Sequence, residues 1–550
     1  MSWLKKLAIV AIVLAVVAAG AYASRKTLLL HALGWYTDIK HPRAPNHPVP
    51  WDEGPATAAA PAAQRPPNVV VILADDLGFN EVSTYGHGIK GQPTPNIDAL
   101  AHEGVRFDRG YAGNAVCSPS RATLLTGRYS SRFGFEYTPT PGNMAKVAPM
   151  LGVQGRRPAV LHPETADQIA DFDDLGMPPS EITVAELLKT RGYHTVHIGK
   201  WHLGSTREMR PQNQGFDESL FMESGLYMPE NDPNVVNSKQ DFDPIDRFLW
   251  PNMRYATSYN GGGWFEPKGY LTDYYTDEAV HAIHASRNRP FFLYLAHWAV
   301  HTPMQALKSD YDALADIPEH RARVEAAMVR ALDRSVGRVM QALKDEGLDG
   351  NTLIVFTSDN GAPNYIGLPD VNKPYRGWKL TYFEGGFHVP YAAKWPGHIP
   401  SGTVYTYPVH SIVILPTAAA AAGAELPQDR TLDGVDLLPY LAREKTGAPH
   451  DVLFWRDGSY QAVIARGWKL QVAERPKKAW LFHLDEDPTE QVDLTQKEPA
   501  KVAELKSLLD AHNAEMKPPA WPSFIELPVA IDKTLDQPES PGDEFVYWQN

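Results

Sequence analysis

Short apolar runs rich in Val, Ile and Phe alternate with longer amphipathic stretches along most of the chain, from about residue 68 onwards. Four of these runs carry no charged residue and have the length of strands, namely residues 69–73, 195–198, 291–295 and 353–356. Such runs are typical of strands that are buried on both faces of a parallel sheet. The pattern therefore predicts an α/β fold with a mostly parallel central sheet flanked by helices.

Polar residues follow each of these four runs directly. Ligands of an open parallel sheet bind outside the carboxyl ends of its strands. We therefore expect the side chains that follow the runs to converge on one site: Asp75, Asp76, Lys200, His202, His301, Asp359 and Asn360.

The pattern changes after about residue 442, where the apolar pieces become shorter. Residues 462–465 and 468–472 read as strands, and residues 500–511 read as an amphipathic helix. We expect a catalytic domain over residues 68–442 and a smaller C-terminal α+β domain with a short antiparallel sheet over residues 443–550. A length of 550 residues agrees with a large domain and a smaller companion.

Residues 231–275 are crowded with Trp, Tyr, Pro and Gly and show little periodicity, which predicts long loops over the site. The aromatic residues of this region and its borders offer a platform for an aryl group or a sugar ring, although packing under the loops is the expected role of most of them. They are Tyr227, Trp250, Tyr255, Tyr259, Trp264 and Tyr270.

The N-terminus has the pattern of an export signal. Lys5 and Lys6 precede an apolar run over residues 7–19, and Ala21-Tyr22-Ala23 has the small residues of a cleavage site. Residues 1–23 are therefore expected to be a signal peptide or an uncleaved membrane anchor, and both readings stay open. Either one predicts an exported protein, periplasmic or extracellular, with membrane attachment in the second case. Residues 24–67 are expected to form a Pro- and Ala-rich extended tether.

Charge and cysteine content narrow the function. A net charge of -13 disfavours a nucleic-acid partner, because binding phosphates requires clustered Lys and Arg. Cys117 is the single cysteine, so no intrachain disulfide can form. Taken alone, a single cysteine is most often a small buried apolar residue.

The residues around Cys117 change that reading. Pro119 suits the first turn of a helix, and the helix would direct its amide donors towards the Cys117 side chain. Arg121 adds a cation one turn further on. This much would suit a direct thiolate nucleophile.

Three carboxylates and one amide oxygen, from Asp75, Asp76, Asp359 and Asn360, are hard ligands that suit Ca²⁺ or Mg²⁺. Either acidic pair alone would more simply cap a following helix. Together, and without a cation, the carboxylates would repel one another, so the sequence predicts one cation site.

The segment Cys-Ser-Pro-Ser-Arg-Ala-Thr-Leu-Leu-Thr-Gly-Arg at residues 117–128 resembles the signature of type I sulfatases of the alkaline phosphatase superfamily. Leu-Ala-Asp-Asp-Leu-Gly at 73–78, Gly-Lys-Trp-His-Leu-Gly at 199–204 and Ser-Asp-Asn-Gly at 358–361 agree in order and spacing. The resemblance implies an alkaline-phosphatase-like α/β domain, a small C-terminal domain with a four-stranded sheet, and hydrolysis of sulfate monoesters.

The resemblance also implies the chemistry of the site. Cys117 would be oxidised to formylglycine by a formylglycine-generating enzyme, and residue 117 would join the acidic residues and Asn360 around Ca²⁺ or Mg²⁺. One hydroxyl of the aldehyde hydrate would attack sulfur and expel the alcohol, and the second would lose its proton as sulfate leaves. The assisting residues would be Arg121 and His202 at the hydrate, and Lys200, His301 and Lys379 at the sulfate and leaving group.

One position departs from the family pattern, because His388 stands where Arg is more common. The change leaves Lys379 intact and concerns the support of its own loop. The substrate, a sulfated small molecule or a glycan, is not defined by the sequence. Two alternatives are a phosphonate or phosphodiester hydrolase of the same superfamily, and an anion-binding protein in which Cys117 is never oxidised.

Overall fold

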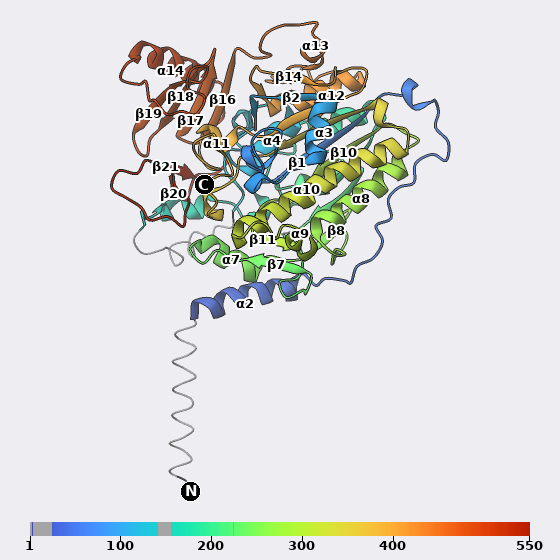
Figure 1. Ribbon diagram of the computed structural model, residues 1–550, viewed down its shortest axis with the longest axis horizontal. Coiled ribbons are helices and arrows are strands. Elements are labelled where there is room, and N and C mark those ends of the chain that lie inside the picture. The colour runs from blue at the N-terminus through green and yellow to red at the C-terminus, as the bar shows by residue number, and fades with distance from the viewer. Residues whose placement is uncertain (1–2, 4–24, 141–155, 224) are drawn as a thin grey trace.

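The computed structural model describes residues 3, 25–140, 156–223 and 225–550. A ten-stranded mixed sheet forms its centre (Figure 1). In spatial order the strands are β14 (Thr403–Tyr405), β2 (Val105–Phe107), β13 (Tyr391–Lys394), β12 (Thr352–Ser358), β1 (Asn68–Ala74), β10 (Phe291–Ala296), β5 (His194–Gly199), β6 (Glu218–Met222), β8 (Thr257–Tyr259) and β9 (Trp264–Phe265).

The four apolar runs form the middle of this sheet, as the pattern predicts. Strands β12, β1, β10 and β5 are neighbours and run parallel, with Val71 opposite Val355 on one side and Tyr294 on the other. All seven residues of β1 are buried, so its two faces both lie in the core. The carboxyl ends of the four strands therefore meet at one edge of the sheet.

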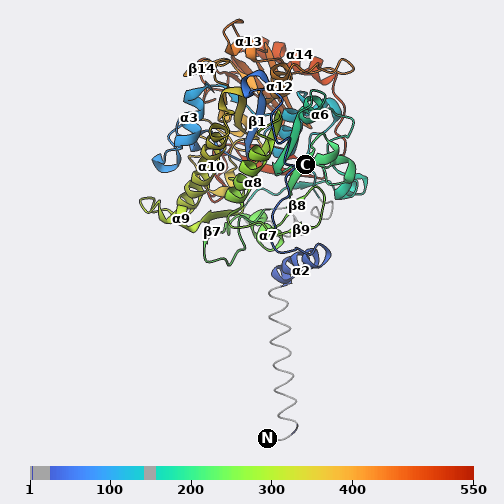
Figure 2. The same ribbon diagram turned by 90° about the vertical axis from the view of Figure 1, so that its right-hand side faces the viewer.

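Helices cover both faces of the sheet (Figure 2). One layer contains α3 (Pro95–Glu103), α8 (Leu271–Ser286) and the long α10 (His320–Asp345), and the other contains α4 (Cys117–Thr126), α6 (Val184–Lys189) and α12 (Ile414–Ala422). The remaining short elements are β3 (Gly110–Tyr111), β11 (Met304–Leu307), β15 (Val409–His410), α9 (Lys308–Asp312), α11 (Glu384–Phe387) and α13 (Leu438–Leu441).

The C-terminal part forms the expected small α+β unit. Strands β16 (Val452–Asp457), β17 (Tyr460–Ala465), β18 (Trp468–Ala473) and β19 (Lys478–His483) make a four-stranded antiparallel sheet, and α14 (Pro499–Asn513) packs on it through Leu505 and Leu509. The chain then adds β20 (Ile525–Ala530) and β21 (Phe545–Gln549). Strand β20 pairs with β21 on one side and with β4 (Val160–Leu161) of the larger domain on the other.

Residues 231–275 contain more regular structure than the predicted long loops. The region holds β7 (Val235–Ser238), α7 (Pro244–Asn252), β8 and β9, and β8 extends the central sheet by pairing with β6. Strands this short show no clear alternation of apolar and polar residues in the sequence, and the strands with which they pair lie elsewhere in the chain. Of the aromatic residues, four are buried and Tyr259 and Trp264 are partly buried, so packing is their main role, as expected for most of them.

Residues 24–67 also differ from the extended tether that we predicted. Helix α2 (Arg25–Lys40) occupies the first part and packs against α7 (Figure 1). The following stretch lies on the larger domain, where the buried Trp51 donates a hydrogen bond from Nε1 to Glu278 at 2.7 Å. The predicted signal or anchor over residues 1–23 falls outside the described residues apart from residue 3. Among the described residues, no helix is both long and apolar enough to cross a membrane.

Candidate active site

The acidic residues of the site stand at the carboxyl ends of two adjacent strands. Asp75 and Asp76 follow β1, and Asp359 and Asn360 follow β12. Asp76 adopts a left-handed backbone with φ of 61°, a conformation that Asp tolerates better than most residues. Its amide donates to Asp359 Oδ1 at 3.3 Å, so the two strand ends are joined directly. The predicted convergence of these residues is therefore observed.

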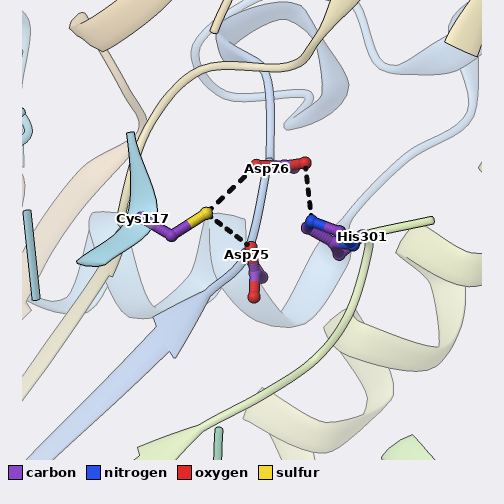
Figure 3. A group of neighbouring side chains, drawn as sticks. All are labelled: Asp75, Asp76, Cys117 and His301. Carbon is purple, nitrogen blue, oxygen red and sulfur yellow. Dashed lines mark hydrogen bonds and ion pairs between the residues drawn. The ribbon is translucent and has the colours of Figure 1, made fainter. Parts of the chain in front are cut away.

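Cys117 lies at the first turn of α4 and points its sulfur at the acidic pair (Figure 3). Its Sγ is 3.6 Å from Asp75 Oδ1 and 3.9 Å from Asp76 Oδ1. Burial raises the pKa of the Cys117 thiol to about 12, so the thiol is protonated at neutral pH. A direct thiolate mechanism is disfavoured for that reason.

His301 completes a group of four candidate metal ligands with Asp75, Asp76 and Cys117, whose ligand atoms all lie within 4.8 Å of one another. Its Nδ1 donates to the carbonyl oxygen of Thr302 at 2.6 Å, which leaves Nε2 unprotonated and 3.5 Å from Asp76 Oδ2. Burial lowers the pKa of His301 to about 4, so the ring is neutral. The resemblance implies that His301 contacts the sulfate, and in the structure His301 also lies with Asp75, Asp76 and Cys117 among the candidate metal ligands.

Three cationic side chains surround the carboxylates. Arg121 Nη2 is 3.1 Å from Asp75 Oδ2 and 2.7 Å from Asp359 Oδ2. Lys200 Nζ is 2.6 Å from Asp75 Oδ2, and Lys379 Nζ is 2.8 Å from Asp76 Oδ1. All of these charges are buried or nearly so, and their mutual pairing is what allows them to stay in the interior.

The pKa shifts of the carboxyl groups follow from this arrangement. Burial opposes ionisation of Asp75, but Lys200 and Arg121 outweigh it and hold the pKa of Asp75 well below its ordinary value. Burial and the charge of Asp75 raise the pKa of Asp359 to about 6. The site thus keeps one firmly ionised carboxylate and one whose charge is more easily neutralised.

Asn360 shows that the donor set fits a cation. Its Nδ2 donates to Asp76 Oδ1 at 2.6 Å, while its buried Oδ1 has no hydrogen-bond partner among the described residues. An unpartnered buried oxygen costs free energy unless a ligand uses it. An amide oxygen beside three carboxylates is the kind of ligand set that Ca²⁺ and Mg²⁺ take.

His202 lies among the same charged residues, but among the described residues it lacks the contact with residue 117 that its predicted role at the hydrate implies. It is buried, has a φ of 63°, and its Nδ1 lacks a partner among the described residues. Burial and the charge of Lys200 lower the pKa of His202 well below its ordinary value, so the ring is neutral. No hydrogen bond joins His202 to Cys117 within the part of the chain that the structure describes.

Two further residues contact the site and were not found from the sequence. The Tyr365 hydroxyl donates to Asp76 Oδ2 at 3.3 Å. The Trp298 ring lies 4.1 Å from the His301 ring and 4.7 Å from Lys200 Nζ, measured from its centroid. The only sequence signal for Trp298 was its position close to His301 along the chain.

His388 lies outside the cluster and has a supporting role in its loop. Its Nδ1 is 2.9 Å from Glu384 Oε2 and its Nε2 is 2.8 Å from the carbonyl oxygen of Asp108. The imidazole thus satisfies both of its ring nitrogens within the buried wall of the larger domain.

Comparison with known proteins gives consistent matches over most of the chain. The family model described as Sulfatase matches residues 67–424. N-acetylgalactosamine-6-sulfatase of Sus scrofa is 34% identical over 416 residues, covering 74% of this chain and 72% of the pig protein. Arylsulfatase A of Bos taurus is 33% identical over 483 residues, covering 81% of this chain and 86% of the bovine protein.

Solved structures with a similar fold give the same picture. The crystal structure of Ps i-CgsB in complex with k-i-k-neocarrahexaose has a TM-score of 0.69 and 29% identity, and covers 83% of this chain and 95% of that one. PsFucS1 sulfatase from Pseudoalteromonas sp. has a TM-score of 0.62 and 25% identity, and covers 89% of this chain and 94% of that one.

Proposed function

Because this chain belongs to the sulfatase family, whose members hydrolyse sulfate esters, we propose that it cleaves sulfate monoesters with a formylglycine made from Cys117 and one divalent cation. The observation that carries the proposal is the position of Cys117, which begins a buried helix and faces Asp75 and Asp76. Its protonated thiol disfavours direct attack by sulfur.

The cation would be held by Asp75, Asp76, Asp359 and Asn360, with residue 117 as a further ligand, and His301 close by. Ca²⁺ or Mg²⁺ bound there would polarise the sulfate group and offset the charge of the carboxylates. Oxygen ligands favour these ions over thiophilic metals.

The cationic residues have separate tasks in this proposal. Arg121 contacts both Asp75 and Asp359 and so fixes the ligands of two strands relative to each other. Lys200 and Lys379 bring ammonium groups to opposite carboxylates, where they would bind sulfate oxygens and stabilise the charge that develops during transfer.

Two neutral imidazoles are available for proton transfer. His202 has an unpartnered Nδ1 among the described residues and would accept a proton from the hydrated aldehyde of residue 117. His301 would assist the leaving alcohol from the far side of Asp76.

The names of the relatives, rather than the site alone, support a class of substrate. One curated relative is named for N-acetylgalactosamine-6-sulfate and one solved structure holds an oligosaccharide, which supports a sulfated glycan. The name of arylsulfatase A supports a small aryl ester as a test substrate. The N-terminal pattern supports export to the periplasm or outside the cell, and a formylglycine-generating enzyme would act on the chain before that.

The test is release of inorganic sulfate by protein purified from its own host, measured with an aryl sulfate and with sulfated oligosaccharides. We expect release that disappears in Cys117→Ala while the thermal midpoint stays close to that of the parent. An exposed-site variant, Asp510→Ala on α14, should keep full activity.

Two outcomes would contradict the proposal. Hydrolysis of phosphonates or phosphodiesters without sulfate release would favour the phosphorus-directed alternative. Binding of sulfated ligands with no turnover, in protein from the native host, would favour the anion-binding alternative.

A further inference from the structure

We propose that helix α2 lies flat on a phospholipid bilayer and contacts it through an outward face of Ala32, Trp35, Tyr36 and Ile39. The inference concerns where the protein is held and does not depend on the proposed function. Figures 1 and 2 show α2 at the rim of the molecule, outside α7 and away from the C-terminal sheet.

One face of α2 is packed closely against α7. A Cβ added at Gly34 would come within 2.0 Å of the carbonyl oxygen of Pro251, so the two backbones touch at this glycine. Four residues further along the same face, Asp38 Oδ1 is 3.1 Å from Arg254 Nε. These contacts fix the rotation of α2 about its own axis.

The opposite face of α2 is apolar and exposed. Residues advance by about 100° around a helix, which places Trp35, Tyr36 and Ile39 on the side away from Gly34. Trp35 is 69% exposed, Tyr36 55% and Ile39 59%, and Ala32 is exposed on the same side. An ordinary surface helix presents polar residues there.

This exposure is unusual within the molecule itself. Among the described residues, the next most exposed large hydrophobic side chains after residue 3 and these three are Val404 and Val492, at 49% each. Val404 and Val492 lie in different segments of the chain, whereas the three residues of α2 form one face. Grouped exposed apolar side chains mark an interaction surface.

The sequence before α2 indicates which surface covers this face. Residues 7–19 are an apolar run, and Arg25 and Lys26 follow it at the first residues of α2. Chain that inserts into a bilayer would place the start of α2 within a few residues of the headgroups, about 3.5 Å per residue. Arg and Lys next to the apolar run suit anionic headgroups.

An orientation of α2 along the bilayer is the one that brings its exposed apolar face to the headgroups. The helix has 16 residues and is about 24 Å long. If its axis stood upright, Trp35 and Ile39 would be held above the headgroups, whereas a flat helix brings its whole outer face to them. Trp and Tyr prefer the interface between headgroups and acyl chains, which matches Trp35 and Tyr36.

The experiment measures the depth of position 39 in a membrane. Full-length protein is made by cell-free synthesis with vesicles of phosphatidylcholine and phosphatidylglycerol, so that residues 1–23 are retained. The single cysteine of an Ile39→Cys, Cys117→Ala chain carries an environment-sensitive fluorophore, and acyl-brominated lipids serve as quenchers. We expect a blue-shifted emission and about a twofold loss of intensity with brominated lipids, as for a side chain at the acyl boundary.

A matched control carries the same label at position 404 of β14 in place of Val404, and its emission should stay that of an aqueous site. Tyr36→Cys provides a second labelled position on the same face in case Ile39→Cys fails to fold. Equal, aqueous emission at positions 36 and 404 would overturn the proposal. A blue shift at position 39 that needs no vesicles and grows with protein concentration would also overturn it, because a second copy would then cover the face.

Discussion

Asp75, Asp76 and Asp359 form a group of carboxylates that the chain holds together with cations from three other segments. Arg121 comes from α4, Lys200 follows β5, and Lys379 comes from a loop before α11. Each cation pairs with a carboxylate at 3.1 Å or less. The chain therefore holds groups of both charges at fixed positions within one buried site.

Asp359→Ala should weaken divalent-cation binding by about 10- to 100-fold and remove turnover, because it deletes one carboxylate and leaves Asp75 as the carboxylate partner of Arg121. Calorimetric titration with Ca²⁺ and with Mg²⁺ gives the affinity, and sulfate release gives the activity. Asp510→Ala serves as the control for a lost surface carboxylate. Full activity in Asp359→Ala would contradict the metal assignment.

We expect Trp298 to act as a positioning residue, since its ring contacts both His301 and Lys200. Trp298→Leu removes both ring contacts, and the loss of a cation–π interaction of about 0.5–2 kcal/mol predicts about a two- to thirtyfold fall in kcat. Trp298→Phe keeps an aromatic face and should restore most of the rate. Equal losses of kcat in the two variants would show that the ring contacts do not position these residues.

The four buried strands were predictable because each is a continuous apolar run followed by polar residues. Asp75 and Asp359 were expected to lie close together because the carboxyl ends of parallel strands lie at one edge of a sheet. The small pieces β8 and β9 and the helix α2 were not predictable, since β8 and β9 are too short to show a period and α2 depends on contact with α7. Trp298 was missed because its role is a ring contact, which leaves no spacing pattern.

The loop after β1 is supported from behind by a pair of buried acids. Glu81 ends the short 3-10 helix η2 (Phe79–Glu81) and accepts a hydrogen bond from the Gly78 amide at 2.5 Å. Its other oxygen and Glu325 Oε2 of α10 are buried and lack a donor among the described residues. Burial raises the pKa of Glu81 to about 8, and burial together with Glu81 raises the pKa of Glu325. The pair is therefore expected to share a proton.

This shared proton predicts how stability depends on pH. The folded state retains the proton up to about pH 8, whereas an unfolded Glu releases it near 4.5. The stabilisation is fully present below pH 4.5 and is lost as the pH rises through about 8, at up to about 1.4 kcal/mol per pH unit.

Glu325→Gln offers an amide donor in place of the proton and should flatten this dependence. The thermal midpoint of Glu325→Gln, relative to that of the parent, should increase as the pH rises from about 5 to about 8. Glu504→Gln, at an exposed position of α14, is the control and should follow the parent at every pH. Parallel curves for the parent and Glu325→Gln would refute the shared proton.

The C-terminal sheet is joined to the larger domain by a buried ionic contact. Lys469 of β18 is fully buried, with Nζ 2.7 Å from Glu384 Oε1 of α11 and 2.8 Å from Glu490 Oε1. The hydrophobic core also continues across this junction through Trp455 and Trp480. The two parts therefore share one interior.

Lys469→Met should lower the free energy of unfolding by about 3–5 kcal/mol, because it leaves Glu384 and Glu490 buried without their cation. The urea midpoint measures this loss, and Lys506→Met, at an exposed position of α14, is the matched control with no expected change. An unchanged midpoint in Lys469→Met would mean that the junction is held by apolar packing alone.

The proposed activity depends above all on conversion of Cys117 into the aldehyde that attacks sulfate. The most direct measurement is the mass of the tryptic peptide spanning residues 110–121, released from protein made in its own host. We expect the mass of an aldehyde at position 117. An unmodified thiol in protein that still releases sulfate would contradict the claim, because turnover would then proceed without the formylglycine.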